Sequence, residues 1–219
     1  MKDRFTAHIF WGSYSPFSLL TGTALVILAS SRLSFALICA GAIIWVYGLT
    51  SLVFSAAVKI LPVKGKKIIL LFLSAFICGI FMILIGLINP LLIFGMVFFL
   101  FLIPPCLLGS GLFDVSMGID VDIEEAVSRA VMEGLMLSAI IVAFALIREP
   151  LGMGTLSFPG GAQGIVEVFG SVENDNYVPI RVLSASAGGL LLFGYAMALF
   201  RYFRSQKADA ERDNREEER

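Results

Sequence analysis

The chain has 219 residues, of which 58% are hydrophobic and only 15% are charged, and its formal net charge is −1. Its mean hydropathy of +0.91 lies outside the range of soluble globular domains, so the composition predicts an integral membrane protein. The three cysteines stand apart in apolar runs, which excludes a disulfide framework and a self-contained metal motif. The sequence also lacks a nucleotide-binding fingerprint and a CxxC pair, so any substrate chemistry must belong to partner proteins.

Six apolar stretches are interpreted as transmembrane spans. They cover residues 5–31, 33–58, 68–88, 91–113, 130–147 and 182–200. We interpret the first as a retained span, with a cleaved signal peptide as the alternative. The glycine-rich connection over residues 148–181 is expected to include a short surface-lying turn at residues 165–169. Residues 1–203 then form one transmembrane domain, and residues 204–219 form a charged tail.

The fourth span contains Pro104-Pro105, which predicts a break in its helix. Two prolines remove two backbone donors and clash with the preceding turn, so a regular helix cannot pass through them intact. In one interpretation a half-helix restarts at Cys106 and presents its positive N-terminal end and a thiol to the bilayer interior. The alternative is a proline-kinked helix with an inert packing cysteine. Ser15-Pro16 predicts a similar break in the first span.

Positive charge predicts the orientation in the membrane. The lysines between residues 59 and 67 and the basic residues between 201 and 207 mark the cytoplasmic side. Both termini are then cytoplasmic, and the connection over residues 148–181 lies outside. Two sets of three spans in opposite orientation, each opening with a broken helix, predict inverted repeats over residues 5–88 and 91–203. The expected fold is an all-α integral membrane protein of six transmembrane helices.

Three charged residues of the fifth span are candidates for a functional role. Glu133 lies near the entrance of this span and is either an ion-path carboxylate or a residue that faces the headgroups. Arg148 and Glu149 end the span. They are either an ion-path pair or a helix-end pair that locks the following loop, and the second interpretation is preferred.

Two short segments carry a resemblance to a known family. Glu133-Gly134 opens the fifth span, and Arg-Glu-Pro-Leu-Gly-Met-Gly-Thr-Leu closes it at residues 148–156. This pattern resembles the Rnf/Nqr family of six-span membrane subunits, and the chain is closest in topology to the RnfE/NqrD side. In that family an acidic-Gly pair opens the span and an Arg-Glu-x-x-Gly-x-Gly-Thr-Leu segment closes it. The chain is therefore identified as a divergent member.

The resemblance implies a function in electron transport. It implies a non-catalytic subunit of an ion-translocating complex, of the Rnf type (ferredoxin:NAD) or the Nqr type (NADH:quinone), that moves Na⁺ or H⁺. It also implies a bacterial or archaeal cytoplasmic membrane, a homologous six-span partner of opposite topology, and further redox subunits. The alternatives are an inverted-repeat transporter or channel-like protein without a redox role, and a structural assembly subunit.

The resemblance further implies an iron–sulfur cluster shared between two such subunits, each of which gives two cysteines. Here Cys106, followed by Gly109, lies near one of the two family patterns, one residue short in spacing. Ser15 stands where the second cysteine is expected. Since such clusters normally need four thiolates, this serine predicts a cluster that is altered or lost.

Overall fold

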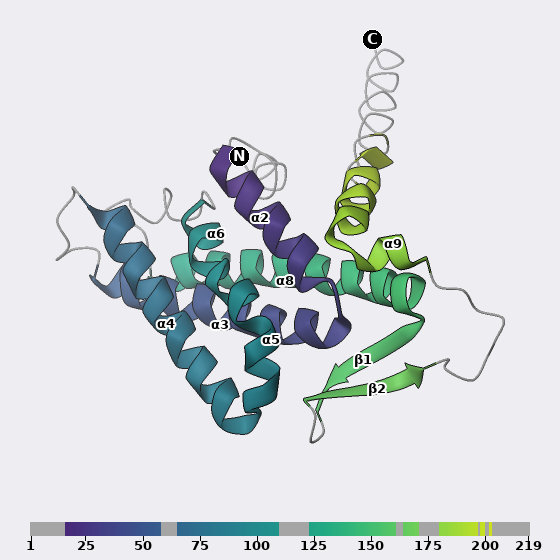
Figure 1. The fold of residues 1–219 in the computed structure, drawn as a ribbon. Helices are drawn as coiled ribbons and strands as arrows, with labels where there is room; N and C mark the ends of the chain where they lie inside the picture. The colour runs from purple at the N-terminus through teal and green to yellow at the C-terminus, as the bar shows by residue number, and fades with distance from the viewer. Residues whose placement is uncertain are drawn as a thin grey trace, which may run out of the picture.

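The computed structural model describes residues 16–57, 65–109, 123–160, 164–170, 180–196, 198, 199 and 202. The described chain is a layer of packed helices with one small β-hairpin at one end (Figure 1). Its elements are α2 (Pro16–Ala29), α3 (Leu33–Ala57), α4 (Lys66–Ile88), α5 (Pro90–Phe101), α6 (Ile103–Gly109), α8 (Ile123–Met153), β1 (Thr155–Pro159), β2 (Ile165–Gly170) and α9 (Arg181–Ser184). A shorter apolar helix, Ser186–Ala196, follows α9.

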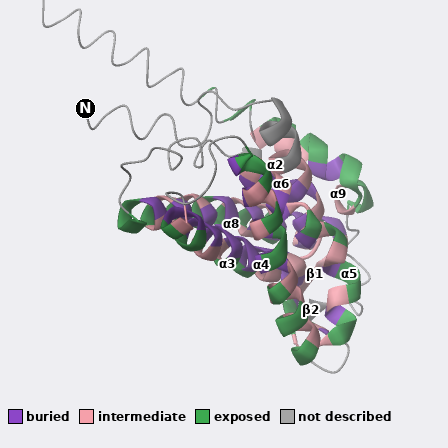
Figure 2. Cartoon of the chain, turned by 90° about the vertical axis from the view of Figure 1, so that its left-hand side faces the viewer, coloured by how far each residue is buried: buried purple, intermediate pink, exposed green. Residues whose placement is uncertain are grey.

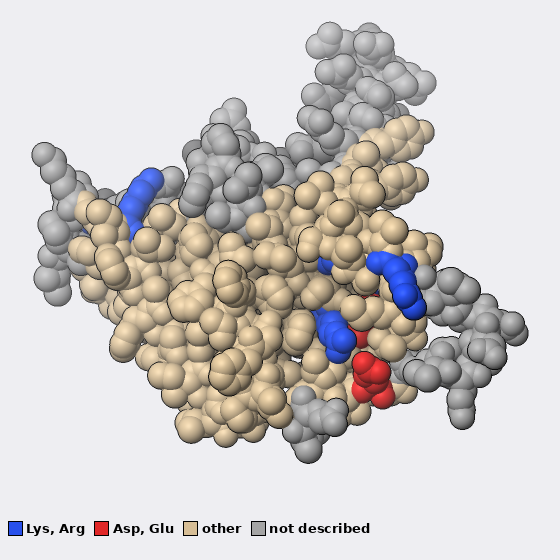
Figure 3. All heavy atoms as spheres, in the orientation of Figure 1, with Lys and Arg blue, Asp and Glu red and all other residues tan. Residues whose placement is uncertain are grey.

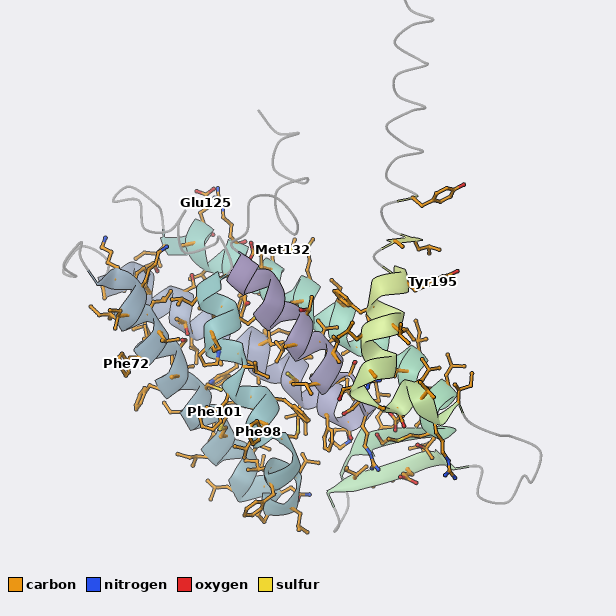
Figure 4. All side chains as sticks on the ribbon, turned by 45° about the horizontal axis from the view of Figure 1, so that its top comes forward. Phe72, Phe98, Phe101, Glu125, Met132 and Tyr195 are labelled. Atoms are coloured by element: carbon orange, nitrogen blue, oxygen red, sulfur yellow. The ribbon has the colours of Figure 1, made fainter. Side chains whose placement is uncertain are left out.

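Four helical stretches of the described chain are long and apolar enough to cross a membrane: Leu33–Ala57, Lys66–Ile88, Pro90–Leu108 and Ile123–Met153. Their outer faces carry large exposed apolar side chains, such as Phe72 (71%), Phe94 (86%) and Phe98 (82%). Figure 4 shows Phe72 and Phe98 pointing away from the helices. In Figure 3 the charged side chains visible on this face lie toward its two ends, on either side of a broad uncharged band. The protein is therefore membrane-embedded, because lipid tolerates such a surface and water does not.

Helices α3 and α8 form the central antiparallel pair. The start of α3 lies beside the end of α8, and further along the pair the Ser138 hydroxyl donates to the Ala40 carbonyl (3.1 Å). Tyr47 then packs on Gly134, where a Cβ would lie 3.3 Å from the Cβ of Tyr47. The absent side chain lets the two helices approach closely, as small residues do in membrane helix pairs. The faces of α3 and α8 that meet are buried, as Figure 2 shows by colour.

The break in the fourth span lies at Leu102, two residues before the first proline. Helix α5 ends at Phe101 and α6 begins at Ile103, so the prediction that a half-helix restarts at Cys106 is wrong. Pro104 and Pro105 occupy the first turn of α6, where backbone N–H groups have no helical partner and proline costs little. The Cys106 N–H already donates to the Leu102 carbonyl (3.1 Å). The proline-kinked alternative therefore describes this span, which runs over Pro90–Leu108.

The connection after the fifth span differs from the sequence prediction. Helix α8 does not end at residues 148–150 but continues through Pro150 to Met153. Strands β1 and β2 then form an antiparallel hairpin in place of the expected turn, so the described fold is not purely helical. The expected sixth span also begins differently, since Ala185 is extended (φ −73°, ψ 155°) between α9 and the helix Ser186–Ala196.

Candidate functional site

Arg148, near the end of α8, is a buried charged side chain with 1% of its surface exposed. Its Nε donates to the Leu183 carbonyl (2.7 Å), and its Nη2 donates to the carbonyls of Ser184 (3.1 Å) and Ala185 (2.9 Å). These carbonyls belong to the end of α9 and the residue after it, and the last carbonyls of a helix have no helical partner. A cation at this position also complements the negative end of the helix dipole.

The same guanidinium reaches a second helix end. Its Nη1 donates to the Ile27 carbonyl in the last turn of α2 and to the Ser30 hydroxyl (3.2 Å) just beyond it. The planar fork of five donors allows one side chain to join α8 to both α2 and α9. Burying an unpaired charge is costly, so this set of acceptors is what makes the position of Arg148 tenable.

Glu149 makes the complementary contact at the start of α3. Its side chain is also 1% exposed, and Oε2 accepts the Leu33 N–H at 2.6 Å. Leu33 is the first residue of α3, where a carboxylate satisfies a free donor and meets the positive end of the dipole. Among the described residues, Oε1 has no hydrogen-bond partner. Two consecutive residues of opposite charge therefore hold helix ends of opposite polarity.

In the segment over residues 148–156, two positions require glycine, each for a different geometric reason. A Cβ on Gly152 would lie 2.8 Å from the backbone N of Ser184, so only glycine permits this approach of α8 to α9. Gly154 has φ 70°, a left-handed conformation that ends α8, and its N–H donates to the Pro150 carbonyl (2.9 Å). The segment is thus built to stop a helix and turn the chain against α9.

The hairpin that follows is held to the start of α3 and to Arg32 just before it. The fully buried Ser157 hydroxyl donates to the Ser34 hydroxyl (3.2 Å), and the Ser34 N–H donates to the Ser157 hydroxyl (3.4 Å). Arg32 pairs with Glu167 of β2 at 3.8 Å, and both side chains are partly exposed. Residues far apart in the chain therefore form one assembly around Arg148 and Glu149 at this end of the helix layer.

Cys106 lies where α2 and α6 meet. It is 7% exposed, and a Cβ built on Gly22 of α2 would lie 3.7 Å from its Sγ. The Tyr47 side chain hydrogen-bonds to the thiol, and the partly buried Glu133 is near enough for its charge to act on Cys106. Glu133 thus lies in the neighbourhood of Cys106, without a direct contact between them being part of the site. Ser15, the other expected ligand, lies outside the described residues.

The two other cysteines face the same interior, which the sequence did not indicate. Cys39 (0% exposed) lies near both Cys78 (2% exposed) and Cys106, and the Cys78 thiol donates to the Leu100 carbonyl (3.3 Å). They come from three different helices, and no spacing within the chain signals this convergence. Even so, the described residues contain no group of three or more metal-ligating side chains that could hold an ion. They do not fit an iron–sulfur cluster held by this chain alone, which would normally need four thiolates.

No protein-family model and no curated protein matches this chain. The resemblance to the Rnf/Nqr subunits therefore stays a prediction that rests on the residues of the fifth span and its closing segment.

Proposed function

We propose that this chain is a membrane subunit of an ion-translocating electron-transport complex of the Rnf or Nqr type. The observation that carries the proposal is the segment over residues 148–156, the most specific part of the resemblance. Its Arg148, Glu149, Gly152 and Gly154 each make a distinct contact or turn that joins α8 to neighbouring elements. We infer that this segment has a structural role, because its residues hold helices together. Partner subunits would then bind the electron donor and acceptor.

The same proposal includes six spans arranged as two inverted repeats. In its support, α3 and α8, which would be the second spans of the two repeats, run antiparallel. Helices α2 and α6, which belong to the first spans, meet at Cys106. Helix α4 and the helix Ser186–Ala196, which belong to the third spans, lie at opposite flanks of the layer (Figure 1). A two-fold relation between the halves would produce all three placements.

The proposed orientation predicts how introduced cysteines react in intact cells. Ser171→Cys should react with a membrane-impermeant thiol reagent and Ser205→Cys should not, because the lysine-rich second loop places Ser205 in the cytoplasm. The native cysteines give little background, since they are at most 7% exposed. Labelling at Ser205 in place of Ser171 would reverse the orientation.

The redox proposal assigns Cys106 to an iron–sulfur cluster shared with a homologous six-span subunit of opposite topology. Gentle detergent extraction followed by mass spectrometry should recover that partner. The isolated complex should show iron-dependent visible absorbance, which Cys106→Ala should abolish. Cys39→Ala and Cys78→Ala should leave it intact, because both thiols lie in uninterrupted helices. Ser15→Cys should strengthen cluster retention by restoring a sulfur ligand.

A transporter without a redox role is the second candidate, and the surroundings of Cys106 favour it. The thiol is buried against Gly22 and Tyr47 of its own chain and is not offered to a partner in this conformation. If the purified protein is a stable monomer without iron, and Ser15→Cys does not restore iron binding, the transporter is established over the electron-transport subunit. Glu133 would then be the ion-path residue to test, since intramembrane carboxylates are commonly functional.

A further inference from the structure

The hairpin β1–β2 has two chemically different faces. In its register Ser157 is opposite Glu167, and Phe158 is opposite Val166. Side chains alternate between the faces of a strand, so these two pairs point in opposite directions. The face with Ser157 and Glu167 is turned toward the start of α3, where Ser157 bonds to Ser34 and Glu167 pairs with Arg32 just before the helix.

The opposite face is apolar and partly exposed. Leu156 on this face packs against the core, whereas Phe158 is 43% exposed and Val166 is 44% exposed. Phe158 and Val166, which we call the outer hairpin face, carry no charge. The polar side of the hairpin is packed on the protein, while apolar side chains on the other side are exposed, so this exposure needs an explanation.

The outer hairpin face continues the apolar surface of the helices. Gly164, the residue before β2, lies against the turn between α4 and α5, since a Cβ there would lie 3.4 Å from Asn89 Oδ1. That turn is flanked by Leu87 (79% exposed), Ile88 (80%) and Leu91 (62%). These residues end two helices that are apolar and long enough to cross a membrane. The lipid-facing surface therefore extends from the helix ends to the hairpin.

Backbone hydrogen bonding limits how deep the hairpin can lie. Among the described residues β1 and β2 pair only with each other, so each strand keeps one unpaired edge. Open sheet edges are not stable in hydrocarbon, where water cannot satisfy them. At the headgroup boundary water reaches the edges, while an apolar face enters the acyl region by about 5–10 Å.

We propose that the hairpin is an in-plane membrane element whose outer face, Phe158 and Val166, binds lipid acyl chains at the headgroup boundary. Arg32 and Glu167 would lie on its protein side at the level of the headgroups. This proposal does not depend on electron transport, because it rests on the hairpin and the helix ends alone.

Spin-label accessibility in a bilayer tests the proposal. The full chain carrying F158C or V166C is labelled with a nitroxide and placed in nanodiscs of phosphatidylcholine and phosphatidylglycerol. Both labels should be relaxed more by apolar oxygen than by a water-soluble nickel chelate, as at the lipid-facing control L91C. The ratio of the two accessibilities should be several-fold higher than at E167C, the neighbour on the opposite face. The wild-type chain treated with the same nitroxide reagent measures the background reaction of the buried native cysteines.

Two results would overturn the proposal. Preferential nickel access at positions 158 and 166 would show that the face meets water, and low access to both reagents would show that protein covers it. Phe158→Trp gives a second measurement, with the fluorescence of Trp11 and Trp45 subtracted by means of the wild-type chain. Its emission should be quenched by lipids brominated near the headgroup, and an unquenched signal also contradicts lipid contact.

Discussion

Replacing Arg148 by alanine is expected to lower the free energy of unfolding by about 3–5 kcal/mol, the usual range when one partner of a buried charged network is removed. The substitution removes the donor from the Ile27 carbonyl, in a buried bond, and from the Leu183 and Ala185 carbonyls, in partly buried bonds. Each unsatisfied buried group costs on the order of 1–3 kcal/mol, although neighbouring shifts recover part of this. Reversible unfolding of the purified chain in detergent measures the difference.

A matched control is Arg129→Ala in the same helix. Arg129 pairs with Glu125 one turn earlier on an exposed face, and such pairs contribute roughly 0–1 kcal/mol. Arg148→Lys should be intermediate, because an ammonium group keeps the charge but lacks the planar fork that reaches both α2 and α9. Equal effects of Arg148→Ala and Arg129→Ala would refute the role of Arg148 as the link between helix ends.

Gly152→Ala should destabilise the protein by about 1–3 kcal/mol, the range for a side chain forced into a packed contact. The added Cβ would lie 2.8 Å from the Ser184 backbone N and 3.2 Å from its Cα. Backbone atoms cannot rotate aside, so α9 must move away from α8. That movement would also lengthen the bonds from Arg148 to the end of α9. The same detergent unfolding measurement detects the loss.

Gly79→Ala is the control for the glycine prediction. It lies within α4, and a Cβ there would meet nothing within 4 Å. Alanine at an open helical position reduces backbone freedom in the unfolded chain, so this change should stabilise by about 0.4–1 kcal/mol. A loss of stability at Gly79 as large as that at Gly152 would show that the close approach of α8 to α9 is not the cause.

The sequence by itself determined the features that depend on local composition. The apolar stretch predicted over residues 33–58 is α3 (Leu33–Ala57), and the one over residues 68–88 is α4 (Lys66–Ile88). Lys66 and Lys67 mark the start of α4. Asn89-Pro90 ends α4 and begins α5, and Asn89 accepts the Leu92 N–H. These signals lie within a few residues of the boundaries that they set, so no distant contact is needed to read them.

Proline and glycine were harder to interpret from the sequence. The two prolines of the fourth span predicted a break at their own position, but the first turn of a helix tolerates them, and the kink lies at Leu102. The glycine-rich connection predicted a loop with a surface turn. It contains a hairpin whose Ser157 and Glu167 contact Ser34 at the start of α3 and Arg32 before it, more than a hundred residues earlier.

Only the tertiary structure decided what the candidate residues contact. Arg148 and Glu149 were recognised in the sequence as charges at a helix end, but their acceptor and donor groups are backbone atoms of Ile27, Leu183 and Leu33. Any residue type offers such atoms, so no side-chain pattern reveals the pairing. That the three cysteines all face the interior likewise depends on how three helices pack. Helix ends and helix faces become neighbours only when the helices pack together. The polar backbone groups that this packing buries must then find partners inside the protein.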